Sequence, residues 1–243
     1  MLAVGNKKTM ESSAQKITSK KKIIPYGQNW HYETLPRQTK KALMFLSEEK
    51  WLKESSWYLA GGTALALQTG NRKSLDLDFF TENKDFDTEE LLARFSANKD
   101  WVLNFSRKNT IYGQLLKAKV SFIAYPFFIP KQEPLWHGVI KVLQAKDIAV
   151  MKITAISQRG RKRDFFDLYW CAKNIEPLEE IIKRLKVQYP SVAHDYHHIL
   201  KSLVYFEDAE SDPEPEINFD AGWKKVKNFF IKEIPEIAEK IMK

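Results

Sequence analysis

Residues 57–80, WYLAGGTALALQTGNRKSLDLDFF, decide the fold of this chain. The apolar run at 57–60 ends at Gly61-Gly62, which predicts a short strand stopped by glycines. Good helix formers fill residues 63–68, so a short helix is expected directly after the glycines. Polar and apolar residues then alternate over 74–80 with the period of a strand. The stretch therefore predicts a strand–helix–strand unit.

The alternating segment also predicts chemistry. Its period of two places Ser74, Asp76 and Asp78 on one face, and Leu75 with the other apolar residues in the core. Aspartate is uncommon in strands, and two on one face repel each other unless a cation compensates. Such a pair suits Mg²⁺, which takes its other ligands from water and nucleotide phosphates, and the pair has room for two ions. The alternative is the solvent-exposed face of an amphipathic strand.

Glycines between a strand and a helix let backbone N–H groups approach a triphosphate, whose charge the helix N-terminus favours. Gly61 and Gly62 have this position, and Thr63 adds a hydroxyl donor. Arg72 either neutralises phosphate or lies in a turn. With Ser74 on the face of the aspartates, the pattern predicts an NTP site.

The remaining pattern divides the chain into a front half with strands and a helical back half. Helices are predicted at 36–53 and 88–97, and strands at 101–107, 110–116, 119–125 and 140–143. In the back half, helices are predicted at 147–158 with Asp147 as the N-cap, and at 161–174, 177–187, 192–206 and 221–242. Trp136 and His137 fall in a Pro-flanked loop that they either anchor or use to stack a base. We expect a basic flexible arm at 1–34, a core at 35–146 and a helical domain at 147–243.

Composition limits the class of protein. The chain has 243 residues, of which 44% are hydrophobic, and no apolar run long enough to cross a membrane. Its single cysteine, Cys171, excludes an internal disulfide and fits a cytoplasmic protein. Residues 1–30 hold six lysines and one glutamate, most of the net charge of +8. This arm either holds RNA by its phosphates or is a solvated tail, or precedes a start at Met10.

Charged residues interrupt an apolar stretch of the back half. Lys152 and Arg159 are seven residues apart and share a helix face. Arg163 and Asp167 have the spacing of a helical ion pair. Asp164 and Asp167 lie in a helix rich in aromatic residues, where a charge is costly unless it is paired or functional. Salt bridges and a functional site remain open alternatives for these residues.

Three segments together resemble the nucleotidyltransferase AbiEii/AbiGii toxin family: GGTALAL at 61–67, RKSLDLDFF at 72–80, and KITAI to RDFFDLY over 152–169. The resemblance covers residues 36–205. It implies an α+β fold, with a polymerase-β-like nucleotidyltransferase core of mixed sheet flanked by helices, followed by a helical C-terminal part. It also implies the toxin of a bacterial toxin–antitoxin or phage-defence system, which transfers a nucleotide from an NTP to tRNA ends and has a cognate antitoxin.

The resemblance assigns roles to residues. It implies that Gly62 and Thr63 cradle the triphosphate and that Asp76 and Asp78 hold the metal. Lys152 is implied to contact nucleotide phosphates. Asp164 is the acidic residue of the last motif, and Arg159, Arg163 and Asp167 have supporting roles.

One departure concerns a third carboxylate, which polymerase-β-like cores often carry on a later strand. In the matching stretch Ser121 stands where an aspartate is expected, and a serine hydroxyl is a poor Mg²⁺ ligand. Three readings result: a nucleotidyltransferase acting on RNA, a transferase that modifies a protein hydroxyl, and a silent nucleotide- or RNA-binding protein. We expect the first, with tRNA as the acceptor and Mg²⁺ as the cofactor.

Overall fold

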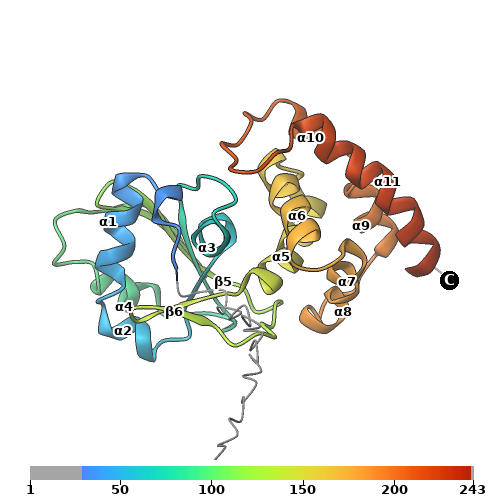
Figure 1. The fold of residues 1–243 in the computed structure, drawn as a ribbon. Coiled ribbons are helices and arrows are strands. Elements are labelled where there is room, and N and C mark those ends of the chain that lie inside the picture. The colour runs from blue at the N-terminus through green and yellow to red at the C-terminus, as the bar shows by residue number, and fades with distance from the viewer. Residues whose placement is uncertain (1–28, 242–243) are drawn as a thin grey trace, which may run out of the picture.

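The computed structural model describes residues 29–241, and its centre is a seven-stranded mixed sheet (Figure 1). The strands are β1 (Tyr58–Ala60), β2 (Leu77–Thr81), β3 (Trp101–Arg107), β4 (Thr110–Leu115), β5 (Ala118–Ala124), β6 (Leu135–His137) and β7 (Ile140–Val142). Their order is β3-β4-β5-β2-β1-β7-β6. The pairs β1–β7 and β2–β5 are parallel, and the other pairs are antiparallel. The predicted mixed sheet is confirmed.

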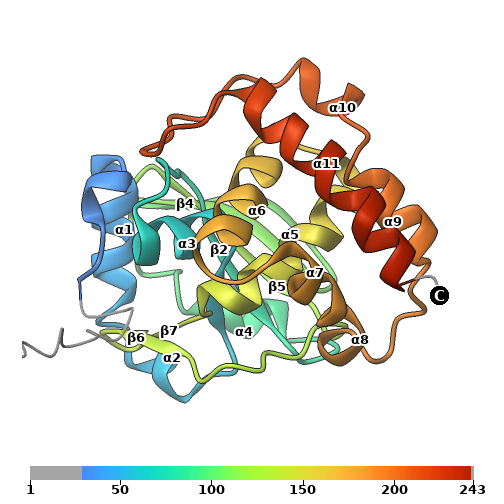
Figure 2. The ribbon, with the colours of Figure 1, turned by 45° about the vertical axis from the view of Figure 1, so that its right-hand side comes forward.

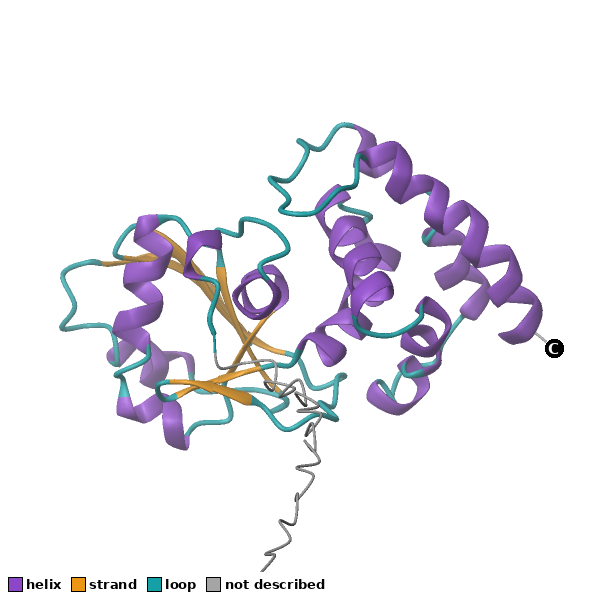
Figure 3. Cartoon of the chain, in the orientation of Figure 1, coloured by secondary structure: helices purple, strands orange, loops and turns teal. Residues whose placement is uncertain are grey.

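Helices flank the sheet and form the back half of the chain. The first group is the 3-10 helix η1 (Tyr32–Thr34) with α1 (Arg37–Leu46), α2 (Lys50–Glu54), α3 (Gly61–Thr69) and α4 (Thr88–Ala93). The second is α5 (Ala145–Arg159), α6 (Lys162–Asn174), α7 (Leu178–Lys183), α8 (Leu185–Gln188), α9 (Tyr196–Ser202), α10 (Glu207–Glu210) and α11 (Trp223–Ile241). Figure 3 shows the second group gathered beyond α3, away from α1 and α2. The expected helical C-terminal part is present.

The predicted strand–helix–strand unit is formed by β1, α3 and β2. Helix α3 begins at Gly61, directly after β1, and ends at Thr69. Gly70 caps it with a left-handed φ of 66° and donates its N–H to the carbonyl of Ala66. Strand β2 returns antiparallel to β1 with Asp78 opposite Ala60. The start of α3 therefore lies next to Asp78.

Aromatic packing on one face of the sheet determines what the other face presents. The ring of Phe122 on β5 stacks on Phe79 of β2 at 5.0 Å and meets the edge of Trp57 at 5.1 Å. Because successive strand residues point to opposite faces, Asp78 and Ser121 are turned away from this core. The sheet thus presents a polar face beside β2.

Strand β2 begins later than predicted, and the expectation that Leu75 lies in the core is wrong. Leu75 is 59% exposed. The residues before β2 bond to segments outside the sheet: Ser74 donates its N–H to the carbonyl of Thr34 at 3.0 Å, and the hydroxyl of Thr39 donates to the carbonyl of Leu75 at 2.7 Å. These bonds replace a strand ladder.

The predicted helix over 36–53 is two helices. The break falls at Ser47, whose carbonyl accepts the N–H of Val139 at 3.0 Å from the turn between β6 and β7. The predicted loop around Trp136 and His137 is also wrong, because both residues belong to β6. His137 is buried and its Nε2 lies 2.8 Å from the hydroxyl of Tyr32, whereas Trp136 is 48% exposed.

The prediction that Asp147 is the N-cap of α5 is wrong, because Gln144 has that position. Its carboxylate is fully buried in the first turn, where it accepts the N–H groups of Lys131 and Gln132, each at 2.9 Å. Arg184 donates to the other oxygen at 2.6 Å. Asp147 therefore ties the segment before β6 to the end of α7.

Helix α6 packs its aromatic residues against α11 in the core of the helical part. Phe165 and Phe166 pack against Trp223 of α11, at ring distances of 5.7 and 5.8 Å. Cys171 is fully buried in the same helix, and burial raises the pKa of its thiol, which makes it a core residue.

The expected N-terminal arm lies largely outside the described residues, which begin at residue 29. Its last part packs on the core: Thr34 is fully buried, and His31 donates its N–H to the carbonyl of Leu67 at 2.8 Å. Within residues 29–241, every helix is too short or too polar to cross a bilayer.

Candidate active site

A cleft of about 280 Å³ collects most of the residues that the sequence predicts as functional. It lies between the start of α3, the segment leading into β2, and helices α5 and α6. Ten predicted residues line it: Gly61, Gly62, Arg72, Ser74, Asp76, Asp78, Lys152, Arg159, Arg163 and Asp164. Thr63 and Asp167 lie outside the lining. The cleft therefore joins the front and back halves of the chain.

The N-terminus of α3 opens into this cleft. Among residues 29–241 no side chain caps the helix at Ala60, so the N–H groups of its first turn are available to a ligand. Gly61 has a positive φ of 71°, which favours glycine, and a Cβ there would lie 3.2 Å from Oδ2 of Asp78. The glycines thus bring backbone donors close to the carboxylates, an arrangement that suits an anion.

Replacing Gly62 by alanine is expected to disturb the cleft. The new Cβ would lie 2.3 Å from Nη2 of Arg72, which is buried and cannot swing away. We expect a loss of about 1–3 kcal/mol in the free energy of unfolding, with weaker nucleotide binding. The control is Gly222→Ala, because a Cβ there meets no atom of the described chain within 4 Å. Equal urea midpoints for the two variants would contradict the fixed position of Arg72.

The two predicted metal ligands, Asp76 and Asp78, both reach the cleft. Burial raises the pKa of Asp78 and the charge of Asp76 raises it further, whereas the hydrogen bond from Ser121 lowers it. Such a buried carboxylate beside a second one fits a hard divalent cation. In the described part of the chain no three His, Cys, Asp or Glu residues form a metal cluster, so an ion here would complete its shell with water and phosphate.

Ser121 lies where we expected a third carboxylate. The parallel pairing of β2 and β5 sets it opposite Asp78, and its hydroxyl donates to Oδ1 of Asp78 at 2.7 Å. The serine therefore orients one carboxylate oxygen and leaves Oδ2 of Asp78 toward Gly61.

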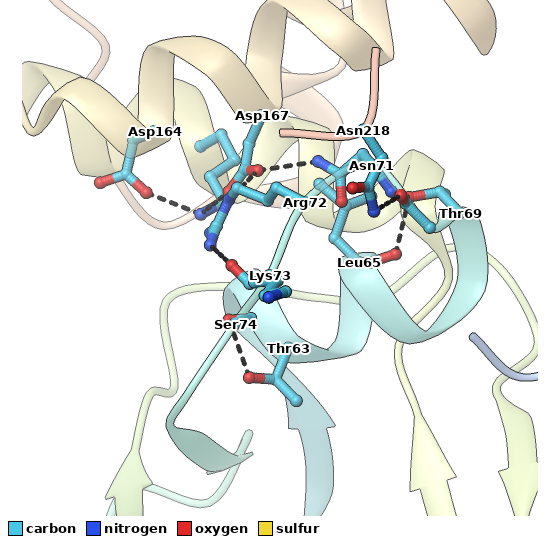
Figure 4. Close-up of polar contacts among 12 residues, drawn as sticks. Thr63, Leu65, Thr69, Asn71, Arg72, Lys73, Ser74, Asp164, Asp167 and Asn218 are labelled. Atoms are coloured by element: carbon cyan, nitrogen blue, oxygen red, sulfur yellow. Dashed lines mark hydrogen bonds and ion pairs between the residues drawn. The ribbon is translucent and has the colours of Figure 1, made fainter. Parts of the chain in front are cut away.

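Asp167 is the centre of a buried ion network (Figure 4). Arg72 donates to it with two nitrogens, Nε at 2.7 Å and Nη2 at 2.8 Å, and Asn71 donates to it at 3.0 Å. The ammonium of Lys152 lies 2.7 Å from Oδ2. Burial alone raises the pKa of Asp167, but the charges of Arg72 and Lys152 outweigh it and hold this pKa well below its ordinary value.

The network shows how the charge of Asp167 is compensated in α6. Asp167 forms a structural ion pair. The four-residue spacing predicted Arg163 as its partner, but the partners are Arg72 and Lys152. Asp167 faces the α3–β2 connection, while Arg163 is exposed and lines the cleft with no ion-pair partner among residues 29–241. Arg163 is therefore a cation available to a ligand.

Lys152 and Asp164 form the wall of the cleft next to this network. The ammonium of Lys152 is 2.6 Å from Oδ1 of Asp164. The other oxygen, Oδ2, is buried and accepts no hydrogen bond within the described chain, with Nη2 of Arg159 3.6 Å away. A buried acceptor without a donor marks a place where a ligand hydroxyl fits.

Thr63 does not offer its hydroxyl to the cleft, contrary to the prediction. The hydroxyl forms hydrogen bonds with the carbonyl of Asp76 and with the hydroxyl of Ser74, the latter at 2.9 Å. Thr63 is buried, and it holds the segment before β2 against α3.

Sequence reasoning missed the apolar wall of the cleft, formed by Phe80, Ile123, Tyr125 and Met151. The signal was present, because Phe80 and Ile123 follow Asp78 and Ser121 at the two-residue spacing that keeps a side chain on one face. These residues offer an apolar surface to a nucleobase.

Sequence reasoning also missed a late segment that supports the site. Lys73 donates its N–H to the carbonyl of Glu216, and Asn218 donates its N–H to the carbonyl of Asn71, both at 2.8 Å. The side chain of Asn218 donates to the carbonyl of Gly70 at 2.7 Å. Figure 2 shows this loop before α11 reaching toward α3.

Known proteins share the sequence and the fold. A protein of Aquifex aeolicus (strain VF5), described as uncharacterized, is 36% identical over 191 residues, which cover 76% of this chain and 89% of the relative. JHP933 from Helicobacter pylori has a TM-score of 0.50 and 22% identity, over 86% of this chain and 95% of its own. MenT4, a nucleotidyltransferase toxin from Mycobacterium tuberculosis H37Rv, has a TM-score of 0.50 and 16% identity, over 82% and 84%.

A family model also matches the chain. The model describes the nucleotidyl transferase AbiEii toxin of type IV toxin–antitoxin systems, and it matches residues 45–111 and 116–241. These ranges contain the glycines of α3, the two aspartates at β2 and the ion network of α6. The chain therefore belongs to the AbiEii family of toxin nucleotidyltransferases.

Proposed function

We propose that this protein transfers a nucleoside monophosphate from an NTP to a hydroxyl of RNA, with tRNA as the acceptor and Mg²⁺ as the cofactor. The family implies an NTP substrate and an antitoxin partner. The observation that supports the finer assignment is the cleft itself, which joins an uncapped helix N-terminus, two carboxylates and several cations.

The triphosphate is assigned to the end of the cleft at Gly61 and Gly62. The N–H groups of α3 donate to phosphate oxygens there, and the positive end of the helix dipole favours their charge. Arg159 and Arg163 line the same cleft and are exposed, so both can reach the phosphates. Arg163 does so without leaving an ion pair of the described chain, whereas Arg159 also lies 3.6 Å from Oδ2 of Asp164. Lys152 adds positive charge from beneath while it holds Asp164 in place.

Asp76 and Asp78 are the residues that would hold Mg²⁺. When bound, the ion supplies charge neutralisation to the triphosphate. The residues of the chain orient the reactants: the hydrogen bond from Ser121 fixes the carboxylate of Asp78. The free Oδ2 of Asp164 accepts a hydrogen bond from a hydroxyl of the nucleotide.

In the reaction, the acceptor hydroxyl gives its proton to water, its oxygen forms a bond to the α-phosphorus, and the bond between the α-phosphorus and the pyrophosphate oxygen breaks. Negative charge shifts onto the leaving pyrophosphate. The side chains of Arg159 and Arg163 stabilise that charge, and the walls of the cleft hold the reacting atoms in line. The protein contributes positioning and electrostatic stabilisation.

The test uses purified protein, total bacterial tRNA, Mg²⁺ and each radiolabelled NTP in turn. We expect label in tRNA with one or two of the four NTPs, and a steep loss of tRNA binding as salt rises. Label on protein would instead support the protein-modifying transferase. NTP binding without label in any acceptor would support the silent binding protein.

Replacing Ser121 by aspartate is expected to lower the Mg²⁺ concentration needed for half-maximal transfer. The new carboxylate would stand beside Asp78, and affinity for a divalent cation rises with the number of charged ligands. Ser121→Asn is the control, because it adds similar volume without charge. A Mg²⁺ requirement that is identical in both variants would contradict a metal position next to Ser121.

A further inference from the structure

A second cavity lies on the other side of the aspartate pair. It shares six residues with the first cleft: Asp76, Asp78, Phe80, Ile123, Arg159 and Arg163. Its floor is formed by β5, β4 and β3. The side chains of this floor are Asn104, Tyr112, Gln114, Lys119, Ser121 and Ile123. The aspartates therefore stand at the junction of two cavities, as a reaction between two substrates requires.

The strand register carries the face of Asp78 to the edge of the sheet. Asp78 is opposite Ser121, Ser121 is opposite Tyr112, and Tyr112 is opposite Phe105. Cross-strand partners point to the same face, so these four side chains form one row. With strands about 4.8 Å apart, Tyr112 lies about 10 Å from the row position of Asp78, which is within reach of one nucleotide.

The outer part of this row is uncovered. Tyr112 is 44% exposed and Phe105 is 46% exposed, with ring centroids 6.0 Å apart. Lys119 and Gln114 are paired in the next row of the same face. Exposed aromatic rings beside a cation and an amide suit the bases and the backbone of a single nucleic-acid strand.

We propose that this acceptor platform, formed by Phe105, Tyr112, Gln114 and Lys119, binds the single-stranded 3′ end of the acceptor RNA, with the terminal base stacked on Tyr112. The inference rests on the proposed function, which requires an acceptor hydroxyl next to the aspartates. The two exposed rings favour RNA over an acidic protein segment, because bases stack on aromatic rings and such a segment has no bases. The NTP has its own place in the first cleft, at the N-terminus of α3.

The test compares Tyr112→Ala, Tyr112→Phe and a control, Trp136→Ala. Trp136 has similar exposure, at 48%, and lies on β6 at the opposite edge of the sheet. With total bacterial tRNA as the acceptor, Tyr112→Ala should raise the KM for tRNA about tenfold or more, without a change in the KM for NTP. Tyr112→Phe keeps the ring and should retain the wild-type KM, as should Trp136→Ala.

A second readout does not depend on catalysis. An RNA dodecamer with 2-aminopurine at its 3′ end should lose fluorescence on binding wild-type protein, because the base stacks, and should keep it with Tyr112→Ala. If wild-type protein labels tRNA and Tyr112→Ala has an unchanged KM for tRNA, the platform is wrong while the function stands. If wild-type protein labels no RNA but Tyr112 quenches the dodecamer, the platform stands and the proposed reaction is wrong. Absence of both signals in wild-type protein overturns both.

Discussion

Replacing Asp78 by asparagine is expected to reduce nucleotide transfer at least about 100-fold and to leave the fold intact. Asparagine has the shape of aspartate, and its carbonyl oxygen can still accept the hydroxyl of Ser121. Only the negative charge is lost, and with it a ligand of the proposed Mg²⁺ site. Because burial raises the pKa of Asp78, its charge is unfavourable to folding, so thermal stability should be unchanged or higher.

The measurement is transfer of labelled nucleotide to total tRNA, with circular dichroism as the check on folding. Asp100→Asn is the matched control, because it removes one exposed aspartate just before β3 and should retain full activity. Calorimetry should show that Asp78→Asn weakens Mg²⁺-dependent NTP binding. Wild-type transfer by the double variant Asp76→Ala, Asp78→Ala would sink the metal assignment.

Replacing Asp167 by alanine is expected to lower the free energy of unfolding by about 3–5 kcal/mol. The change leaves Arg72 without its two-nitrogen partner and removes one of the two carboxylates that hold Lys152, with both cations still buried. Urea denaturation measures the loss. The control is Asp220→Ala, which breaks an exposed ion pair with Lys225 and should cost at most about 1 kcal/mol. A similar cost for the two variants would show that the network contributes little.

The stabilisation by Asp167 should depend on pH. Its pKa in the folded protein lies below the ordinary value of 3.8, so the folded state binds a proton less readily than the unfolded state. The contribution is therefore fully present at neutral pH and decreases as pH falls below about 4. The difference in stability between wild type and Asp167→Asn should shrink on acidification to about pH 3. A constant difference would contradict the lowered pKa.

Local signals explain the parts of the fold that could be predicted from the sequence. Gly61-Gly62 ends a strand and begins a helix because of backbone sterics within the segment itself. The meander of β3, β4 and β5 follows from alternation and turn residues close to one another. The same local periodicity placed Asp78 on the polar face of β2, whereas Asp76 precedes the strand.

Distant partners explain what the sequence did not reveal. Ser47 ends α1 because Val139, far along the chain, takes its carbonyl. Leu75 is exposed because Thr34 and Thr39 hold the backbone around it. Such bonds leave no periodic pattern in the sequence. For that reason the sequence predicted one continuous helix over 36–53.

The partner of Asp167 shows the same limit within the site. Sequence spacing offered Arg163 four residues earlier, which is a sound rule for an exposed helix. In the fold, Asp167 points from α6 to the α3–β2 connection, where Arg72 presents two nitrogens at once (Figure 4). Tertiary packing therefore pairs Asp167 with Arg72, and Arg163 lines the cleft instead.

The connection between α3 and β2 also makes the completion of the active site depend on distant parts of the chain. The partner of Arg72, Asp167, lies 95 residues later in the chain. The side chain that donates to the carbonyl of Gly70 belongs to Asn218, 148 residues later. Such contacts require the closing of a large loop, which costs entropy before any bond is made. A folding intermediate with a complete sheet would carry both aspartates and still lack the wall that α6 provides. The nucleotide cleft is therefore expected to be complete only once α6 has packed on the α3–β2 connection.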